Sequence, residues 1–320
     1  MKFFDLDKAV WQWVLLIVLA FIWGSSFILM KKGLESFDNY QVASLRILIS
    51  FIFLSPVIFR NFKKIKKDQW IPIFIAGLLG SGIPAFLFTT AQTKISSSLS
   101  GMLNSLVPLF TVFIGVLFFG LKLRKMKLLG VAIGLGGALG LLSSTGSISL
   151  ANDELLYGSL VVLATICYAT NVNFIKVKLE EVSSLNITSF GFLLIGPAVA
   201  IYLFTTDFTT RLQTDPDASL NLFFISLLAI FGTALAVIFF NMLIKKVSAV
   251  FASSVTYMIP VFAIFWGFVD GEEIFLMQLL FIGIILSGIY IVNRDKMLEM
   301  REARRQRKAA KKLPDSVSKS

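Results

Sequence analysis

Long apolar runs recur along the whole chain and constrain its fold more than any other feature. At a rise of about 1.5 Å per residue, about 20 apolar residues cross the hydrocarbon core of a bilayer as one helix. Runs of this length predict spans that cover residues 11–30, 40–59, 70–91, 97–119, 127–143, 157–175, 185–204, 220–243, 249–268 and 274–292. The sequence therefore predicts an all-helical, polytopic membrane protein with ten transmembrane helices.

The composition leaves little room for a soluble domain. Of the 320 residues, 56% are hydrophobic and only 15% are charged, and the mean hydropathy is +0.82. A water-soluble domain with this balance would expose large apolar patches. The run 11–30 is longer than a signal-peptide core, and no small-residue cleavage pattern precedes Lys31. We therefore interpret it as a retained helix.

The residue types that most enzymes and metal sites need are scarce in this chain. Histidine is absent, and Cys167 is the only cysteine. This excludes disulfides and argues against zinc sites, haem ligated by histidine, and Ser-His or Cys-His catalysis. The predicted spans carry no paired carboxylates, and no glycine-rich phosphate loop ends in Gly-Lys-Ser or Gly-Lys-Thr. We therefore expect no enzyme activity, no cofactor and no metal.

The placement of lysine and arginine predicts how the chain sits in the membrane. Of the 30 basic residues, 25 fall on the side of the predicted bundle that holds both termini, and four fall on the other side. Because basic residues accumulate in cytoplasmic loops, both termini are expected to be cytoplasmic, in a cell (inner) membrane. The same placement in short loops argues against nucleic acid as a partner.

An internal repeat divides the predicted bundle. Shifting the chain by 152 positions aligns 8 identical residues within 36 ungapped positions. They include Gly80 with Gly232, Phe88 with Phe240, and Pro108 with Pro260. Upstream, a shift of 145 pairs Trp23 with Tyr168 and Ser26 with Asn171. Each copy holds five predicted helices, and an odd number means that the second copy enters the membrane from the opposite side.

The repeat sets the predicted organisation of the chain. Residues 1–10 form a cytoplasmic N-terminus, 11–143 the first repeat, 144–156 an outer linker, 157–292 the second repeat and 293–320 a basic cytoplasmic tail. Ten basic and four acidic residues in the tail predict attraction to anionic lipid. Two inverted repeats are the arrangement by which many secondary transporters build a central site that opens to either face. The sequence therefore favours a transporter.

Several short motifs resemble the EamA type of the drug/metabolite transporter superfamily. The first span carries Trp23-Gly24-Ser25-Ser26-Phe27, and the second carries Arg46. The fourth and ninth spans each carry small residues, an apolar stretch and then Pro108 or Pro260. The resemblance covers about residues 11–292. It implies a ten-helix fold of two repeats that moves small organic solutes, often by efflux of amino acids or other metabolites.

One position departs from this resemblance. An acidic residue usually closes the proline-containing helix in the family, and here it is Glu272 or Glu273 in the second copy. The first copy reads Gly120-Leu121-Lys122 instead. The function of this carboxylate is therefore missing from one half of the protein.

Polar and aromatic side chains near the middle of the predicted spans are the candidate contacts for a small-molecule substrate. Residues three positions apart, such as Trp23 and Ser26, share one helical face. The predicted substrate-binding residues are Trp23, Ser26, Arg46, Asn104, Ser105, Tyr168, Asn171, Thr256 and Tyr257. Interhelical hydrogen bonds that only hold the bundle together would use the same residue types.

Arg46 and three prolines stand out within the predicted spans. Charged residues inside a membrane are costly and usually functional. Arg46 can attract a substrate carboxylate, pair across the bundle, or extend its stem to the outer interface, and the sequence leaves these alternatives open. Pro84, Pro108 and Pro260 lack a backbone N–H and are expected to bend helices that line a cavity. A packing kink without solute contact is the alternative.

A stripe of glycines marks the fifth predicted span, residues 127–143. Such stripes let helix backbones approach closely, either within one molecule or in a homodimer. No Asp, Glu or His lies near the middle of any span, so uniport or exchange fits the sequence at least as well as proton antiport. The sequence predicts a secondary transporter that exports small organic metabolites by alternating access. The alternatives are a passive facilitator or importer, and a membrane scaffold or sensor subunit.

Overall fold

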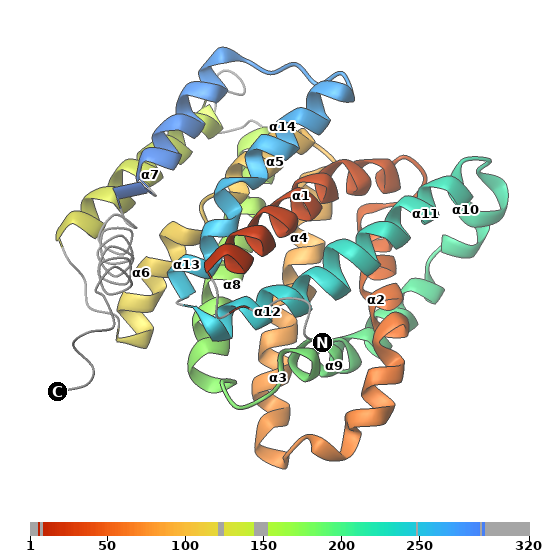
Figure 1. Cartoon of the computed structure of the whole chain (residues 1–320). Helices are drawn as coiled ribbons and strands as arrows, with labels where there is room; N and C mark the ends of the chain where they lie inside the picture. The colour runs from red at the N-terminus through yellow and green to blue at the C-terminus, as the bar shows by residue number, and fades with distance from the viewer. Residues whose placement is uncertain are drawn as a thin grey trace, which may run out of the picture.

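The computed structural model describes residues 6, 9–120, 125–143, 153–247, 249–288 and 290–291, and the regular elements within these ranges are all helical. The first half contains α1 (Ala9–Leu34), α2 (Asn39–Asn61), η1 (Phe62–Lys64), η2 (Lys67–Gln69), α3 (Trp70–Gly77), η3 (Leu78–Gly82), α4 (Ile83–Ala91), α5 (Ser97–Asn104), α6 (Val107–Phe119) and α7 (Lys125–Ser143). The second half contains α8 (Asp153–Lys178), α9 (Ser184–Thr205), α10 (Phe208–Thr214), α11 (Ala218–Leu227), η4 (Leu228–Leu235), α12 (Ala236–Lys246), α13 (Ala249–Ser253), η5 (Ser254–Tyr257) and α14 (Ile259–Val269). An unlabelled apolar helix, Leu276–Gly288, follows (Figure 1).

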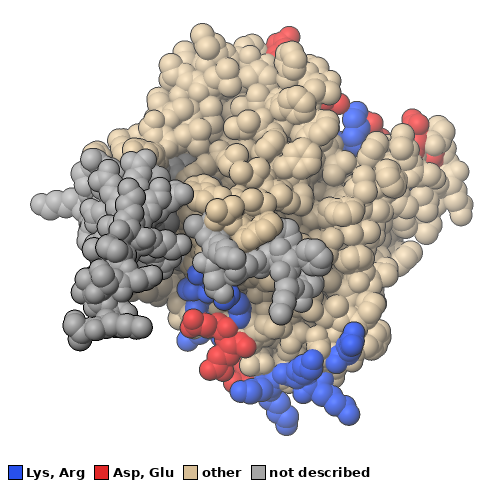
Figure 2. Space-filling model, viewed as in Figure 1, with Lys and Arg blue, Asp and Glu red and all other residues tan. Residues whose placement is uncertain are grey.

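Eight helical stretches of the described residues are long and apolar enough to cross a membrane. They are Val10–Leu34, Asn39–Lys64, Lys67–Ala91, Ser97–Phe119, Leu155–Lys178, Ser184–Thr205, Ala218–Lys246 and Phe251–Val269. Two shorter apolar helices, Ala132–Leu141 and Leu276–Gly288, lie where the sequence predicts the fifth and tenth spans. On the face shown in Figure 2, a broad surface without charged side chains separates two charged ends. The chain is therefore a multi-pass membrane protein, and the count of ten helices stays a prediction.

The chain breaks its helices at two of the three prolines. Pro108 stands in the first turn of α6, after α5 has ended at Asn104. Pro260 stands in the first turn of α14, directly after the 3-10 helix η5. A proline cannot donate to the carbonyl four residues earlier and its ring collides with that carbonyl, so the helix stops and restarts. Pro84 stands in the first turn of α4, which follows the π-helical segment η3 directly.

Close backbone contacts hold the bundle together where glycines face one another. A Cβ atom added at Gly77 of α3 would lie 2.8 Å from the Cα of Gly191 of α9, so the two helices touch through their backbones. The glycine stripe of α7 packs within the molecule, because a Cβ at Gly137 would lie 3.0 Å from Ile284 and Ile285 of the last helix. Figure 1 shows these two helices side by side at one edge of the bundle.

Capping fixes the connection between α2 and the end of α9. The Asp38 side chain accepts a hydrogen bond from the Gln41 backbone N–H at 2.8 Å, and the Gln41 side chain accepts one from the Asp38 N–H at 3.1 Å. This reciprocal pair satisfies two free donors at the start of α2. The Gln41 Nε2 also donates to Thr206 Oγ1 and Asp207 Oδ1, at 3.0 and 2.7 Å. The start of α2 is thereby joined to the end of α9.

Several predicted segments fall outside the described residues. They are residues 1–5 and 7–8 of the predicted N-terminus, residues 144–152 of the predicted linker, the whole tail 293–320, residues 121–124 and Ser248. The predicted lipid contact of the tail stays a prediction for this reason.

Candidate functional site

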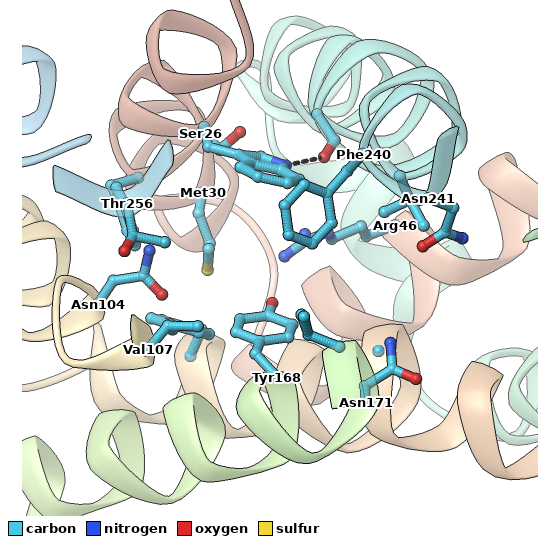
Figure 3. Close-up of a pocket in the computed structure, with 17 residues that line it drawn as sticks. Ser26, Met30, Arg46, Asn104, Val107, Tyr168, Asn171, Phe240, Asn241 and Thr256 are labelled. Carbon is cyan, nitrogen blue, oxygen red and sulfur yellow. Dashed lines mark hydrogen bonds between the residues drawn. The ribbon is translucent and has the colours of Figure 1, made fainter. Parts of the chain in front are cut away.

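A cavity of about 80 Å³ lies between helices of both halves of the chain. Its lining comes from α1, α2, η3, α4, α5, α6, α8, η4, α12 and η5 (Figure 3). Mostly apolar walls with a few polar groups are typical of sites for small organic molecules.

Seven of the nine predicted contact residues line this cavity. They are Trp23, Ser26, Arg46, Asn104, Tyr168, Asn171 and Thr256. Ser105 is fully buried outside the lining, and its hydroxyl donates to the Met102 carbonyl at 2.6 Å. Tyr257 packs against the apolar core instead. Each of these two residues follows a lining residue directly, and consecutive residues of a helix point about 100° apart.

The three predicted prolines are not part of the lining. Pro84, Pro108 and Pro260 are buried at the starts of α4, α6 and α14. Their effect on the cavity is indirect, because the break before Pro108 separates Asn104, the last residue of α5, from Val107, the first residue of α6. Both of these residues line the cavity.

Arg46 is the charged group of the cavity. Its side chain is only 8% exposed, and its guanidinium points into the cavity rather than along α2 to the membrane surface (Figure 3). The Nε atom donates to Thr233 Oγ1 at 2.6 Å, and the Tyr168 hydroxyl interacts with the guanidinium. No carboxylate within the described ranges forms an ion pair with Arg46. Its positive charge is therefore uncompensated there.

Two amide side chains of the cavity are incompletely paired. The Oδ1 atoms of Asn104 and Asn171 are buried and have no hydrogen-bond partner among the residues that the structure describes. Buried polar atoms are normally paired, because an unpaired one costs about 1–3 kcal/mol. Asn104 lies across the cavity from Arg46 in Figure 3. These oxygens are acceptors suited to N–H or O–H groups of a bound molecule.

Aromatic side chains form two walls of the cavity and are fixed by their own contacts. The Trp23 indole N–H donates to the Gly232 carbonyl at 2.9 Å, drawn as a dashed line in Figure 3. Its ring meets Phe240 edge to face, with centroids 5.0 Å apart. On the other wall, Phe88 stacks on Tyr168 with centroids 6.0 Å apart. Paired rings of this kind hold a rigid apolar surface against a ligand.

The structure adds lining residues that the sequence analysis did not name as contacts. They are Phe27, Met30, Gly80, Phe88, Val107, Val172, Gly232, Val237, Phe240 and Asn241. Four of them carry a usable signal, because Gly80 and Gly232, and Phe88 and Phe240, are identical pairs of the 152-residue shift. Asn241 is a polar residue near the end of an apolar run, which is a second signal.

A smaller cavity of about 20 Å³ adjoins the central one. The two cavities share Gly80, Asn171, Val237 and Asn241. The smaller cavity also contacts Thr188 of α9, whose hydroxyl accepts a hydrogen bond from the Asn241 Nδ2 at 3.0 Å. Polar groups therefore continue from the central cavity between α8, α9 and α12.

Comparison with known proteins gives the family of this chain. The EamA-like transporter family matches residues 11–143 and 156–294. The uncharacterized inner membrane transporter YedA of Escherichia coli K12 is 27% identical over 288 residues, covering 88% of this chain and 90% of that protein. An uncharacterized transporter of Archaeoglobus fulgidus is 26% identical, covering 89% and 99%.

Two further comparisons are more distant. The S-adenosylmethionine/S-adenosylhomocysteine transporter of Chlamydia trachomatis is 23% identical, covering 87% of each protein. One crystal structure is similar in fold, with a TM-score of 0.63 and 15% identity, covering 89% of this chain and 96% of that one. The family match spans most of the chain in two segments, and the relatives that match over nearly its whole length are transporters. The chain therefore belongs to the EamA-like transporter family.

Proposed function

We propose that this protein is a secondary transporter that exports a small organic metabolite, such as an amino acid or a related solute, from the cell. The solute binds in the central cavity, and ten helices in two inverted repeats open that cavity to one side and then to the other. Both termini lie in the cytoplasm, and the membrane is the inner membrane of the cell. Homologues named as inner membrane transporters support this location.

The pairing of cavity residues by the repeat supports alternating access. Twelve of the 17 lining residues form six pairs related by the shifts of 145 and 152 positions. These pairs are Trp23 with Tyr168, Ser26 with Asn171, Phe27 with Val172, Gly80 with Gly232, Phe88 with Phe240, and Asn104 with Thr256. A site built from equivalent positions of two inverted copies is reachable from either face when the copies rock against each other.

Two irregular segments support the same two-copy arrangement. The π-helical segments η3 (Leu78–Gly82) and η4 (Leu228–Leu235) overlap after the shift of 152 positions. The break after α5, at residues 105–106, shifts onto residues 257–258, where the 3-10 helix η5 ends. Irregular backbone at membrane depth is tolerated where it is buried in protein or lines a cavity. The segments η3 and η4 both line the cavity, through Gly80 and Gly232.

The single observation that carries the proposal is the unpaired chemistry of the cavity. The Arg46 charge lacks a described carboxylate partner, and the Asn104 and Asn171 oxygens lack donors. A solute with a carboxylate at one end and N–H or O–H donors elsewhere satisfies all three groups. The aromatic rings cover its apolar part. The relative named for S-adenosylmethionine and S-adenosylhomocysteine shows that a protein of similar sequence carries small organic metabolites.

A ligand screen identifies the solute. Purified protein is heated with a panel of L-amino acids and small carboxylic acids, because a ligand that binds only the folded state raises the melting temperature. Counterflow in liposomes, with and without a pH gradient, then separates an exporter driven by protons from a passive facilitator or importer.

Two neighbouring residues at the end of α5, Asn104 and Ser105, distinguish a transport site from a structural bundle. We expect Asn104→Ala to lower counterflow of the identified solute about tenfold, because it removes an amide that faces the cavity. Ser105→Ala is the matched control. Its hydroxyl bonds only to the Met102 carbonyl among the described contacts, so flux stays near the wild-type value. Equal flux in both variants, with folding intact, contradicts the proposal and favours a scaffold or sensor subunit.

A further inference from the structure

Charged and hydroxyl side chains join the ends of three helices on one side of the cavity. We name Lys31, Lys32, Ser97, Ser98, Asp270 and Glu272 the Glu272 cluster. The Glu272 carboxylate accepts hydrogen bonds from the backbone N–H groups of Ser97 and Ser98, at 2.9 and 3.0 Å, and from the Ser98 hydroxyl at 2.6 Å. Its fourth donor is the Lys31 Nζ atom, at 3.1 Å. The carboxylate thereby ties the end of α1 and the start of α5 to the segment after α14.

A second carboxylate extends the cluster. Asp270 forms ion pairs with Lys31 and Lys32, at 2.6 and 3.2 Å. Burial alone would raise the pKa of Glu272, but the hydrogen bonds from Ser98, Ser97 and Lys31 outweigh it and hold this pKa below its ordinary value. Glu272 is therefore ionised, and its side chain is only 6% exposed. Charge-assisted hydrogen bonds to a buried carboxylate are among the stronger side-chain contacts in proteins.

Each of the three joined elements also carries a residue of the central cavity. On α1, Met30 lines the cavity and Lys31 belongs to the Glu272 cluster. The helix α5 begins at Ser97 in the cluster and ends at Asn104 in the cavity. The segment from η5 to α14 begins with the cavity and ends at the cluster. A movement that separates the cluster must therefore shift the cavity walls.

A buried glutamine strengthens this link. The Gln92 Nε2 donates to the carbonyl of Phe27, at 3.2 Å, and to the Ser97 hydroxyl, at 3.1 Å. Phe27 lines the cavity, and Ser97 bonds Glu272 through its backbone. The Ser97 hydroxyl also donates directly to the Phe27 carbonyl at 3.4 Å, so two side chains connect the cluster with this part of the cavity wall.

The positions that the repeat assigns to the opposite end of the bundle carry no equivalent of this carboxylate. Under the repeat, Glu272 corresponds to Gly120, Asp270 to Phe118 and Ser98 to Val250. Lys31 corresponds to Lys176, whose Nζ atom donates to the backbone carbonyl of Lys245 at 3.1 Å. The positions that would repeat the cluster therefore lack both the carboxylates and the hydroxyl.

The smaller cavity leads toward that opposite end. The helix α2 starts on the side of the bundle that holds the Glu272 cluster and ends at Asn61. The Asn61 amide donates to Asn186 Oδ1 of α9 at 3.0 Å. Thr188, two residues further along α9, lines the smaller cavity. The Glu272 cluster thus lies beyond one end of the central cavity, and a polar cavity adjoins it toward the other.

We propose that Glu272 is a positioning residue of the transport cycle, which holds the α1, α5 and α14 end of the central cavity closed. That end opens when Glu272 separates from Ser97, Ser98 and Lys31, whereas the opposite end opens without breaking a carboxylate cluster. The two ends therefore open with unequal ease. The inference rests on the proposed transport function and assigns a conformational step to it.

Cysteine accessibility tests this inference without any substrate. Cys167 is the only cysteine, so a Cys167→Ala chain is a background for single cysteines placed at Met30 or at Asn241. Met30 adjoins the Glu272 cluster, and Asn241 lies where the two cavities meet. The rate of modification by a small, charged methanethiosulfonate reagent reports how often water reaches each position. We expect Glu272→Gln to raise the rate at Met30→Cys about tenfold and to leave the rate at Asn241→Cys unchanged or lower.

The adjacent carboxylate provides the matched control. Glu273 is exposed beside Glu272, and Glu273→Gln removes the same charge from the same loop, so the rate at Met30→Cys should stay at the background value. Glu272→Asp keeps the charge on a shorter stem and should give an intermediate rate. Ser98→Ala is the milder variant if Glu272→Gln does not fold, and it should raise the rate about threefold.

Two results overturn the inference. The first is an unchanged rate at Met30→Cys in a folded Glu272→Gln or Ser98→Ala protein. The second is an equal rise at Met30→Cys and Asn241→Cys, which means general loosening rather than opening of one end. Failure of the proposed function is distinguishable from these results. Equal flux in the Asn104→Ala and Ser105→Ala proteins would contradict transport through the cavity, but it would not change the modification rates at Met30→Cys and Asn241→Cys.

Discussion

Replacement of Arg46 by glutamine is expected to lower the affinity for a carboxylate-bearing solute about 10- to 100-fold. The guanidinium is buried and points into the cavity, where its Nε bonds Thr233 and it interacts with the Tyr168 hydroxyl. Loss of charge-assisted hydrogen bonds to a carboxylate costs about 1.5–3 kcal/mol, which corresponds to this change in the dissociation constant. Arg46→Lys keeps the charge but loses the planar pair of donors, so its affinity should be intermediate. Equilibrium binding to purified protein measures the effect.

The stability of the same variant separates binding from architecture. Because no described carboxylate compensates the Arg46 charge, its removal should leave the melting temperature of the ligand-free protein unchanged or higher. Arg211→Gln is the control. Arg211 is an exposed cation that pairs with Asp207 at 2.9 Å outside the membrane spans, and its loss should leave affinity unchanged. Wild-type affinity in a folded Arg46→Gln protein contradicts a role for Arg46 in binding.

Replacement of Gly77 by leucine is expected to destabilise the fold by about 3 kcal/mol. The added Cβ would lie 2.8 Å from the Cα and 3.0 Å from the carbonyl oxygen of Gly191. Both contacts are backbone atoms of α9, which cannot rotate away as a side chain can. The two helices must therefore separate along their length. We expect the purified variant to melt at a lower temperature than the wild-type protein and to yield less folded, non-aggregated protein.

Gly136 provides the matched control for this substitution. It lies in the exposed face of α7, and an added Cβ there meets no heavy atom of the described residues within 4 Å. Gly136→Leu should leave stability unchanged or raise it, because glycine within a helix costs about 1 kcal/mol relative to alanine. An equal loss of stability at both positions contradicts the interpretation that contact between the backbones of α3 and α9 is specific.

The positions of the spans follow from the sequence because a bilayer imposes one length scale on every crossing. The predicted span 97–119 coincides with the helical stretch Ser97–Phe119. The sequence does not reveal that this stretch consists of two helices with a break between Asn104 and Val107. Pro108 indicates where such a break is favourable, but whether a helix kinks or stops there depends on the neighbours that pair its free carbonyl groups.

The cavity residues downstream of the π-helical segments show where helical periodicity fails. Each π turn adds one residue, so everything after it is rotated by about 100° relative to a regular helix. Phe88 lies after η3, and Phe240 and Asn241 lie after η4. A wheel drawn at 3.6 residues per turn therefore misplaces all three. The segment η4 contains no proline, so the sequence carries no local mark of it.

The roles of Arg46 and Glu272 depend on distant partners that the sequence cannot place. Arg46 is turned toward the cavity by Thr233, which is 187 positions away. The choice between Glu272 and Glu273 depends on the turn at Gly271, where a φ of 81° reverses the chain after α14 and directs Glu272 back to Ser98. A glycine after the end of a helix commonly adopts this left-handed conformation. The turn itself is therefore predictable, and the side chain that it selects is not.

Three of the six repeat-related pairs of the cavity are equivalent in position but unlike in chemistry, namely Trp23 with Tyr168, Ser26 with Asn171, and Asn104 with Thr256. Arg46 has no charged counterpart, because its shifted position is Gly191. A molecule seated on a cation, an amide and an aromatic wall is fixed at three different points. Its mirror image cannot satisfy all three at once. We therefore expect the cavity to prefer one enantiomer of a chiral solute, although related segments of the two halves of the chain surround it.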